Sequence, residues 1–240
     1  MKHAIITGGA RSVGFEVAKQ LLAQGISVSI IDIDGDALSS APTRLDGVET
    51  YTADVSKVAE LEDALSKIIK RHPHITYLIN TPAANPHLPF DEMSFDQIKE
   101  VVDVSLMSYV FAIKTCWDSF EEGGSIINIS SVHGFTTYKG NSMYAAAKAA
   151  VESLTRALAA ELRSKNVRIN AIAPGGFTSE WYQAHNPNWK EKLERGQIFT
   201  PEDMANIVMF LLSDKSRAIN GETIIADGGV FTVRSRSSDW

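Results

Sequence analysis

Tyr144 and Lys148 lie four residues apart in YAAAK, at the start of a segment with helical periodicity. Residues four apart share one face of a helix, so the phenol and the ammonium can meet. A phenol with a pKa of about 10 is a weak acid or base at neutral pH, but a nearby positive charge favours its phenolate. Ser131 ends the run SIINISS, 13 residues before Tyr144. These side chains are compatible with a site that binds a substrate oxygen and transfers a proton at Tyr144, although Y-x-x-x-K is by itself also common on helix surfaces.

A glycine turn, TGGARSVG at residues 7–14, follows the apolar run HAII and precedes the helical segment FEVAKQLLAQG. Gly8 permits a sharp turn, and Gly14 lets the next helix approach the sheet with its N-terminus toward a phosphate. The G-x5-G spacing is also compatible with a purely structural turn. Asp32 ends the next apolar run, 18 residues after Gly14, where a carboxylate can bind ribose hydroxyls, so the combination favours a nucleotide site.

Apolar runs alternate with helical segments along the chain. The runs are 3–7, 27–32, 48–54, 76–80, 125–130, 167–174 and 222–227. They are rich in Ile and Val on both faces, as in strands covered by helices on both sides. The pattern predicts a single α/β domain over 1–240, with a Rossmann-type, doubly wound, seven-stranded parallel sheet and a ligand site at the carboxyl ends of the strands. We expect the tail, 233–240, to be loose.

Composition narrows the function classes. The chain has 240 residues, is 44% hydrophobic and carries a net charge of -6 without long runs of one sign, which argues against nucleic-acid or anionic-membrane partners. Cys116 is the single cysteine, so no internal disulfide can form, and the six scattered histidines indicate no metal site. Without a leader-like N-terminus or an apolar stretch of about 18 residues, we expect a cytoplasmic protein.

Six ordered segments resemble the short-chain dehydrogenase/reductase family, over nearly the whole chain. They are Thr7 with Gly8 and Gly14, Ala53–Val55, Ile127–Ser131, Tyr144 with Lys148, Arg168–Gly175, and Asp227–Gly229. The resemblance implies a hydride transfer between a nicotinamide cofactor and a secondary alcohol or ketone. It also implies that Ser131, Tyr144 and Lys148 are the catalytic residues.

The resemblance further implies a cofactor site along the strand ends. Its residues would be Gly8, Arg11, Ser12, Val13, Gly14, Asp32, Ile33, Asp54, Val55, Asn80, Thr81, Tyr144, Lys148, Pro174, Gly175, Phe177 and Ser179. Asp54 would meet the adenine, and Lys148 would also hold the nicotinamide ribose. The backbone after Pro174 would line the carboxamide, and Ser179 or Thr178 would place a hydroxyl near the pyrophosphate.

The chain departs from the family pattern in three places. Ser12 replaces the middle glycine of the cofactor turn, and Asn80-Thr81-Pro82-Ala83 replaces the family's N-N-A-G. Ser105 replaces the asparagine that helps to hold a water behind the catalytic lysine, and we expect it to take part in the catalytic set. These departures also leave open a catalytically weakened NAD(P)-binding regulator or scaffold with the same fold.

Two residues give opposite indications about whether the cofactor is NAD or NADP. Asp32 would repel a 2′-phosphate, because two unit charges 4 Å apart cost roughly 4 kcal/mol at an effective dielectric constant of 20. Arg11 occupies a position where some NADP-dependent members place a phosphate-binding base. We expect NAD, with NADP as the alternative.

A small-molecule substrate is expected beneath a lid at 178–199. The aromatic and polar side chains of this segment suit a polar ring such as a sugar, a cyclic polyol or a pterin, and equally a hydroxyacyl or steroid ring. The segments 94–120 and 143–165 carry enough apolar residues for a second, intersubunit face. By the family resemblance we expect a homodimer or homotetramer.

Overall fold

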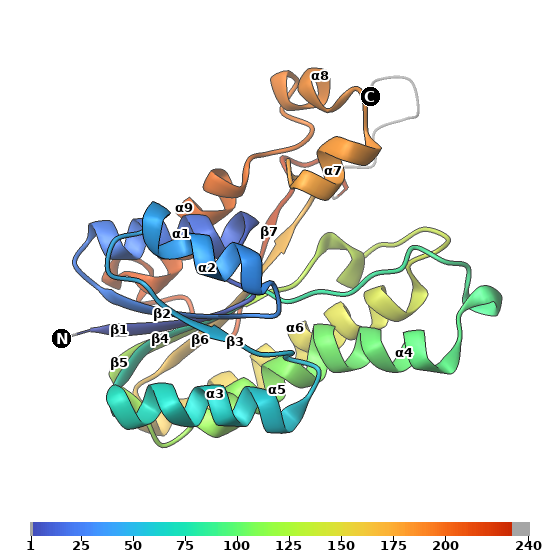
Figure 1. Ribbon diagram of the computed structural model, residues 1–240. Helices are drawn as coiled ribbons and strands as arrows, with labels where there is room; N and C mark the ends of the chain where they lie inside the picture. Colours follow the sequence, from blue (N-terminus) through green and yellow to red (C-terminus); the bar gives the residue numbers. More distant parts are fainter. Residues whose placement is uncertain (1, 232–240) are drawn as a thin grey trace.

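The computed structural model describes residues 2–231, so the expectation for the tail at 233–240 falls outside the described residues. Seven strands form one parallel sheet in the order β3-β2-β1-β4-β5-β6-β7 (Figure 1). The strands are β1 (His3–Thr7), β2 (Ser27–Asp32), β3 (Glu49–Thr52), β4 (Ile75–Asn80), β5 (Phe120–Ile129), β6 (Arg168–Pro174) and β7 (Thr223–Ala226). The predicted doubly wound fold is therefore confirmed, and its strand order reverses between β1 and β4, where such sheets bind ligands.

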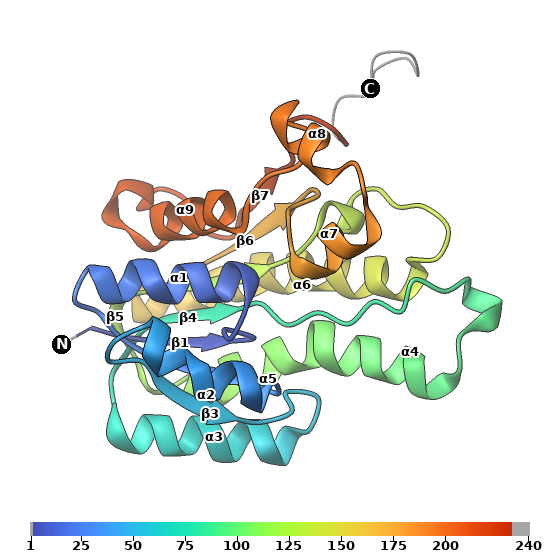
Figure 2. The same cartoon turned by 45° about the horizontal axis from the view of Figure 1, so that its top comes forward.

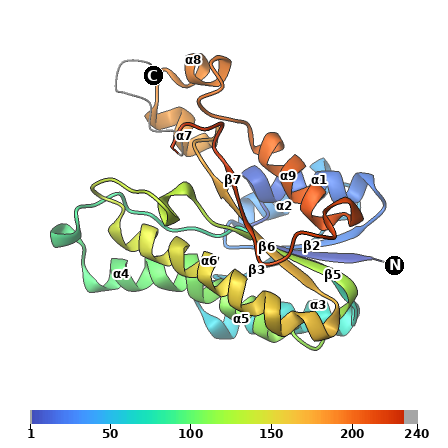
Figure 3. The same cartoon turned by 180° about the vertical axis from the view of Figure 1, so that it is seen from behind.

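Helices cover both faces of the sheet (Figure 2). One layer comprises α1 (Ser12–Ala23), α2 (Gly35–Arg44) and α9 (Pro201–Leu212); the other comprises α3 (Val58–Arg71), α4 (Phe95–Val102), α5 (Ser108–Cys116) and α6 (Ser142–Leu162). Alternate strand residues supply the two cores: Ile6 and Ile30 pack toward α1 and α9, whereas Ile5 and Ile31 pack toward α3 and α5. Figure 3 shows these two layers from behind. Within residues 2–231, no helix combines the length and hydropathy needed to cross a membrane.

The structure differs from the sequence-based elements in three places. The helix α2 was not predicted, because Pro42 and several polar residues mask its periodicity; Asp34 caps it by accepting a hydrogen bond from the Ala37 N–H at 2.9 Å. The segment 94–120 is not one helix, since a π-helical turn at Asp103–Met107 separates α4 from α5. The predicted lid contains two short helices, α7 (Glu180–His185) and α8 (Trp189–Glu194), above the strand ends (Figure 1).

Candidate active site

A cavity of about 990 Å³ lies at the carboxyl ends of the strands, beneath the lid. The loops after β4, β5 and β6 contribute to its lining, as do α6 and the lid. Among its lining residues are Thr81, Ser131, Tyr144, Lys148, Pro174, Gly175, Phe177, Ser179, Tyr182 and Lys192. The predicted catalytic residues Ser131, Tyr144 and Lys148 thus face one cavity.

Tyr144 lies in the first turn of α6, and Ser131 is the second residue after β5. The Ser131 hydroxyl accepts a hydrogen bond from the His133 N–H at 3.2 Å, which fixes the loop, and Ser131 is also hydrogen-bonded to the Tyr144 phenol. Burial raises the pKa of Tyr144 above its ordinary value, and the Ser131 hydrogen bond opposes that rise only in part. The net shift of the Tyr144 pKa is therefore upward, opposite to the lowering expected beside Lys148, and Tyr144 is a neutral phenol at pH 7.

The Lys148 ammonium is buried one turn further along α6. Its Nζ donates to the Ile129 carbonyl at 2.8 Å, to the Tyr109 hydroxyl at 3.1 Å and to the Pro82 carbonyl at 3.4 Å. Burial lowers the pKa of Lys148 to about 7, although Glu152 acts in the opposite direction. The ammonium is aimed at these acceptors, and its Nζ lies 5.7 Å from the Tyr144 ring centroid.

The glycines of the turn allow neighbouring segments of the chain to approach the backbone closely. A Cβ on Gly8, whose φ is +71°, would lie 2.5 Å from the Thr81 Oγ1, and a Cβ on Gly14 would lie 2.7 Å from the Gly8 carbonyl oxygen. Ser12 has the left-handed φ of +52°, which the family's glycine adopts without strain. The Ser12 Oγ is buried and has no hydrogen-bond partner among the described residues. Such an unpaired donor fits a phosphate oxygen, whereas Val13 is buried and packs into the core.

The ends of β2 and β3 place two carboxylates beside this turn. Asp32 accepts hydrogen bonds from the Ala10 N–H at 3.0 Å and from the Asp34 N–H at 3.1 Å. Ile33 follows with its side chain 66% exposed, an unusual exposure that a stacked adenine would reduce.

Asp54 is anchored at the end of β3, next to the buried Val55. It accepts hydrogen bonds from the Ser56 N–H at 3.0 Å and from the Ser56 hydroxyl at 2.7 Å. Partial burial acts to raise the pKa of Asp54, but these bonds together with Lys57 lower it overall. Asp54 is therefore an ionised, fixed acceptor at the strand end.

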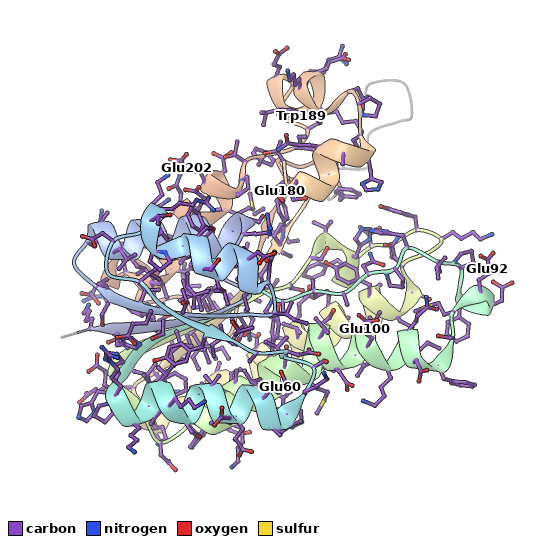
Figure 4. All side chains as sticks on the ribbon, viewed as in Figure 1. Glu60, Glu92, Glu100, Glu180, Trp189 and Glu202 are labelled. Atoms are coloured by element: carbon purple, nitrogen blue, oxygen red, sulfur yellow. The ribbon has the colours of Figure 1, made fainter. Side chains whose placement is uncertain are left out.

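Arg11 does not point freely toward a 2′-phosphate position. Its Nη2 lies 2.7 Å from the Asp34 Oδ2, and its Nη1 lies 2.9 Å from the Glu180 Oε2. Glu180, which Figure 4 labels, lies on α7 in the lid, so the ion pair connects the glycine turn with α7. The two carboxylate partners of Arg11 are thus Asp34, which follows β2, and Glu180 of the lid.

The polar side chains at the end of β4 and in the following loop form hydrogen bonds to other protein groups. Asn80 is fully buried, accepts from the Thr7 hydroxyl at 3.0 Å and donates to the Asn128 Oδ1 at 3.0 Å, so its amide faces the sheet and not the cavity. The Thr81 hydroxyl lies 2.8 Å from the carbonyl oxygens of Thr7 and Gly8 and ties this loop to the glycine turn.

Ser105 lies within the π-helical turn and is fully buried. Its Oγ accepts a hydrogen bond from the Ala84 N–H at 3.0 Å and lies 3.3 Å from the Ala84 carbonyl oxygen. The described hydrogen bonds of Lys148 go elsewhere, so the structure places Ser105 against the loop after β4 and not against the lysine.

The loop after β6 closes the far side of the cavity. A Cβ on Gly175 would lie 2.9 Å from the Cβ of Asp227, which explains the glycine in terms of packing against the D-G-G segment. Phe177 and Ser179 line the cavity, and the Ser179 hydroxyl also caps α7 by accepting from the Tyr182 N–H at 3.1 Å.

Two residues near the site were not singled out from the sequence. Tyr109 reaches the Lys148 ammonium, and Lys192 lines the cavity from α8. Tyr109 lies four residues after Ser105, so helical spacing from the position that replaces the family's asparagine was the available signal. Lys192 carried no signal, because a lysine in a short surface helix is ordinarily solvated.

Comparisons with known proteins agree with this geometry. The model of the family described as "Enoyl-(Acyl carrier protein) reductase" matches residues 8–231. The chain is 31% identical to the 3-oxoacyl-[acyl-carrier-protein] reductase FabG of Chlamydia pneumoniae over 242 residues, covering 95% of this chain and 96% of the relative. It is 30% identical to the diacetyl reductase [(S)-acetoin forming] of Staphylococcus aureus, covering 95% and 97%. Among solved structures, levodione reductase superposes with a TM-score of 0.87 at 26% identity, covering 97% of this chain and 98% of that one.

These relatives cover nearly all of the chain, and the matched region contains residues 8–14 of the glycine turn, Ser131, Tyr144 and Lys148. The chain belongs to the short-chain dehydrogenase/reductase family of oxidoreductases.

Proposed function

We propose that this protein interconverts a secondary alcohol and a ketone, with NAD as its cofactor. The observation that carries the proposal is the convergence of Ser131, Tyr144 and Lys148 on one cavity, with a neutral Tyr144 phenol hydrogen-bonded to Ser131. A phenol at this position can give a proton to a carbonyl oxygen as the ketone is reduced.

The residues around the glycine turn fit a dinucleotide. The Ser12 hydroxyl and the N-terminus of α1 would hold the pyrophosphate, because both offer unpaired donors toward it. Asp32 retains acceptor capacity for the ribose hydroxyls, and Ile33 offers an apolar surface to the adenine. When bound, the nicotinamide supplies the hydride chemistry.

The chain's own residues supply orientation and proton transfer. The Ser131 hydroxyl orients the substrate oxygen beside Tyr144, and Tyr144 donates its proton to that oxygen during ketone reduction. Alcohol oxidation needs the phenolate, which the charged form of Lys148 favours. Because the pKa of Lys148 is lowered to about 7, protonation of this side chain changes near neutral pH, so the rate in both directions depends on pH there.

The charges near the adenosine ribose support NAD over NADP. Asp32 and Asp34 both lie at this position, and Arg11 is already engaged by Asp34 and Glu180. An additional phosphate would meet two carboxylates before it met a free cation.

The cavity also suggests the charge of the substrate. Its described lining residues include no aspartate or glutamate, although the whole chain carries a net charge of -6. The basic side chains that line it are His87, His133, Lys148, His185 and Lys192. Lys192 is half-buried, with its Nζ 3.5 Å from the Tyr182 hydroxyl. We infer that the substrate carries an anionic group, which Lys192 binds at the lid side of the cavity.

A panel of ketones and secondary alcohols, assayed by the absorbance of NADH and NADPH, tests the proposed activity. Cofactor binding is measured separately by thermal shift. Turnover with NAD(H) supports the proposal. The departures at Ser12, Thr81 and Ser105 favour, as the second candidate, a nucleotide-binding regulator, and cofactor binding without turnover across the panel would support that function instead.

We also propose a homodimer or homotetramer. Val104 in the π-helical turn, Phe111 on α5 and Leu158 on α6 remain partly exposed at the edge of the core. Their exposed surface is available for a subunit contact.

A further inference from the structure

The Lys148 ammonium has a complete set of oxygen acceptors. Its three N–H groups are matched by three oxygens: the Ile129 carbonyl, the Pro82 carbonyl and the Tyr109 hydroxyl. Lys148 is 1% exposed, so these contacts replace solvent and decide where the ammonium sits. Two of the acceptors are backbone groups, whereas the third is a side chain that a substitution can remove.

Tyr109 is fully buried at the start of α5. Its hydroxyl lies 2.9 Å from the Pro82 carbonyl and 2.9 Å from the Ile129 carbonyl, the same two groups that Lys148 contacts. A phenol has one proton, so Tyr109 donates to one of these carbonyls and accepts from Lys148. Burial raises the pKa of Tyr109 well above 10, and it therefore stays a neutral phenol throughout the physiological range.

The Ser105 side chain does not accept a hydrogen bond from Lys148, because it is short and is hydrogen-bonded to the backbone of Ala84. Tyr109 follows it by four residues, and its longer side chain extends the same helical side as far as the ammonium. Ser105 thus holds the loop after β4, while Tyr109 reaches the lysine behind that loop.

We propose that Tyr109 is the positioning residue of Lys148, and that its hydroxyl takes the place of a bridging water behind the lysine. This inference deepens the proposed function and rests on Lys148 acting in it. With a buried phenol behind it, Lys148 can exchange its proton only toward the cavity, on the side of Tyr144. The departure at Ser105 is then a redistribution of roles between two residues and not a loss of function.

Other ionisable groups also face Lys148 and must be considered in any test. Among the described residues they are Tyr109 from α5, and Tyr144 and Glu152 from α6. The loop after β4 and the end of β5 contribute backbone carbonyls. Glu152 is held by the Ser130 hydroxyl at 2.8 Å, so a change at Tyr109 leaves its anchoring hydrogen bond in place.

The Tyr109→Phe variant removes only the hydroxyl. A matched control is Tyr77→Phe, because the Tyr77 hydroxyl also lies 3.1 Å from a lysine nitrogen, that of Lys2, but at the opposite end of the sheet. Both variants lose one buried or half-buried phenol contact with a lysine, so a general loss of stability affects both. Only Tyr109→Phe changes the acceptors of Lys148.

The first measurement needs neither cofactor nor substrate: urea unfolding of the wild type and both variants from pH 6 to 10. The pKa of Lys148 is about 7 in the folded chain and 10.5 in an unfolded one, so its contribution to stability rises with pH between these values. Loss of the Tyr109 hydroxyl disfavours the ammonium further. We expect this rise to begin about one pH unit lower in Tyr109→Phe and to be unchanged in Tyr77→Phe.

The second measurement is the pH dependence of kcat for ketone reduction. We expect the basic limb to move to lower pH by about one unit in Tyr109→Phe, with kcat about tenfold lower and KM for the ketone changed less than twofold. Unchanged profiles in both experiments would overturn the inference and leave Tyr109 as a packing residue. If no substrate is turned over but the unfolding profile shifts, the proposed function fails while the placement of Lys148 by Tyr109 stands.

Discussion

Arg11 in the glycine turn and Glu180 at the start of α7 form an ion pair, with Nη1 and Oε2 2.9 Å apart. The pair joins the glycine turn to the lid segment. Both side chains are more than half exposed, so the pair contributes little to stability, about 1 kcal/mol or less. The ion pair matters because it keeps the Arg11 guanidinium bound to carboxylates, where it is not available to a ligand phosphate.

Freeing Arg11 should increase the use of NADP. In the double variant Asp34→Asn with Glu180→Gln, Arg11 loses both carboxylate partners, while the amide introduced by Asp34→Asn can still cap α2. We expect the ratio of kcat/KM for NADPH to that for NADH to rise at least tenfold, about 1.4 kcal/mol. Adding Arg11→Ala to this variant should abolish the gain. An unchanged ratio would show that Arg11 does not reach the 2′ position.

The Ser12 hydroxyl should have opposite effects on the free and the cofactor-bound protein. Its Oγ is buried without a partner among the described residues, so Ser12→Ala should raise the free energy of unfolding of the cofactor-free protein by about 1 kcal/mol. The same change removes a donor to a phosphate, and we expect the Kd for NAD to rise about tenfold. Urea unfolding and calorimetric titration measure the two effects. A Kd equal to that of the wild type would exclude Ser12 from phosphate binding.

The sheet and most helices could be predicted from the sequence, because Ile- and Val-rich strands such as SVSIID alternate regularly with amphipathic segments. The helix α2 could not be predicted, because Pro42 and the polar residues of this segment obscure its hydrophobic periodicity. The N-cap residue Asp34 alone is too short a signal to indicate a helix. The break between α4 and α5 was also missed, because a π-helical turn has almost the same hydrophobic spacing as the helix that it interrupts.

The cavity-lining positions of Ser131, Tyr144 and Lys148 followed from motif spacing. The hydrogen bonds of Asn80 and Ser105 to other parts of the protein could not be predicted in this way, because hydrogen bonds between distant segments leave no local sequence pattern. The same holds for the partners of Arg11, which lie 23 and 169 residues away along the chain.

His3 should make the protein sensitive to acid. Its ring stacks on that of His72, with centroids 3.7 Å apart, and bonds to the hydroxyls of Ser27 and Ser29. Burial, followed by His72, lowers the pKa of His3 from 6.5 to about 4. The unfolded chain therefore binds more protons between these values, and stability is lost as the pH falls from 6.5 toward 4.

Urea unfolding at pH 7.5 and pH 5.5 measures this loss. In His3→Gln we expect the difference in the free energy of unfolding between the two pH values to be about 1 kcal/mol smaller than in the wild type. In the control His74→Gln the difference should equal that of the wild type, because His74 is exposed. Equal pH dependence in the wild type and His3→Gln would contradict the assignment.

Lys192 should determine the preference for charged substrates. The test series is 3-oxobutanoate to 6-oxoheptanoate together with the corresponding methyl esters. We expect the acids to be preferred, and Lys192→Met to lower their kcat/KM about tenfold while leaving the esters within twofold. The matched control is Lys190→Met on the same helix, whose side chain does not line the cavity. Turnover of the esters without any preference for the acids would refute the charge assignment but not the reaction.

Tyr144 should transfer the proton in an NAD-dependent ketone reduction. The most direct measurement compares wild type and Tyr144→Phe, which keeps the ring and removes the hydroxyl, by NADH oxidation under saturating ketone, with NADH affinity measured in parallel by fluorescence. We expect kcat to fall at least about 100-fold while the Kd for NADH changes less than threefold. Turnover within about tenfold of the wild type in Tyr144→Phe would contradict this role of Tyr144.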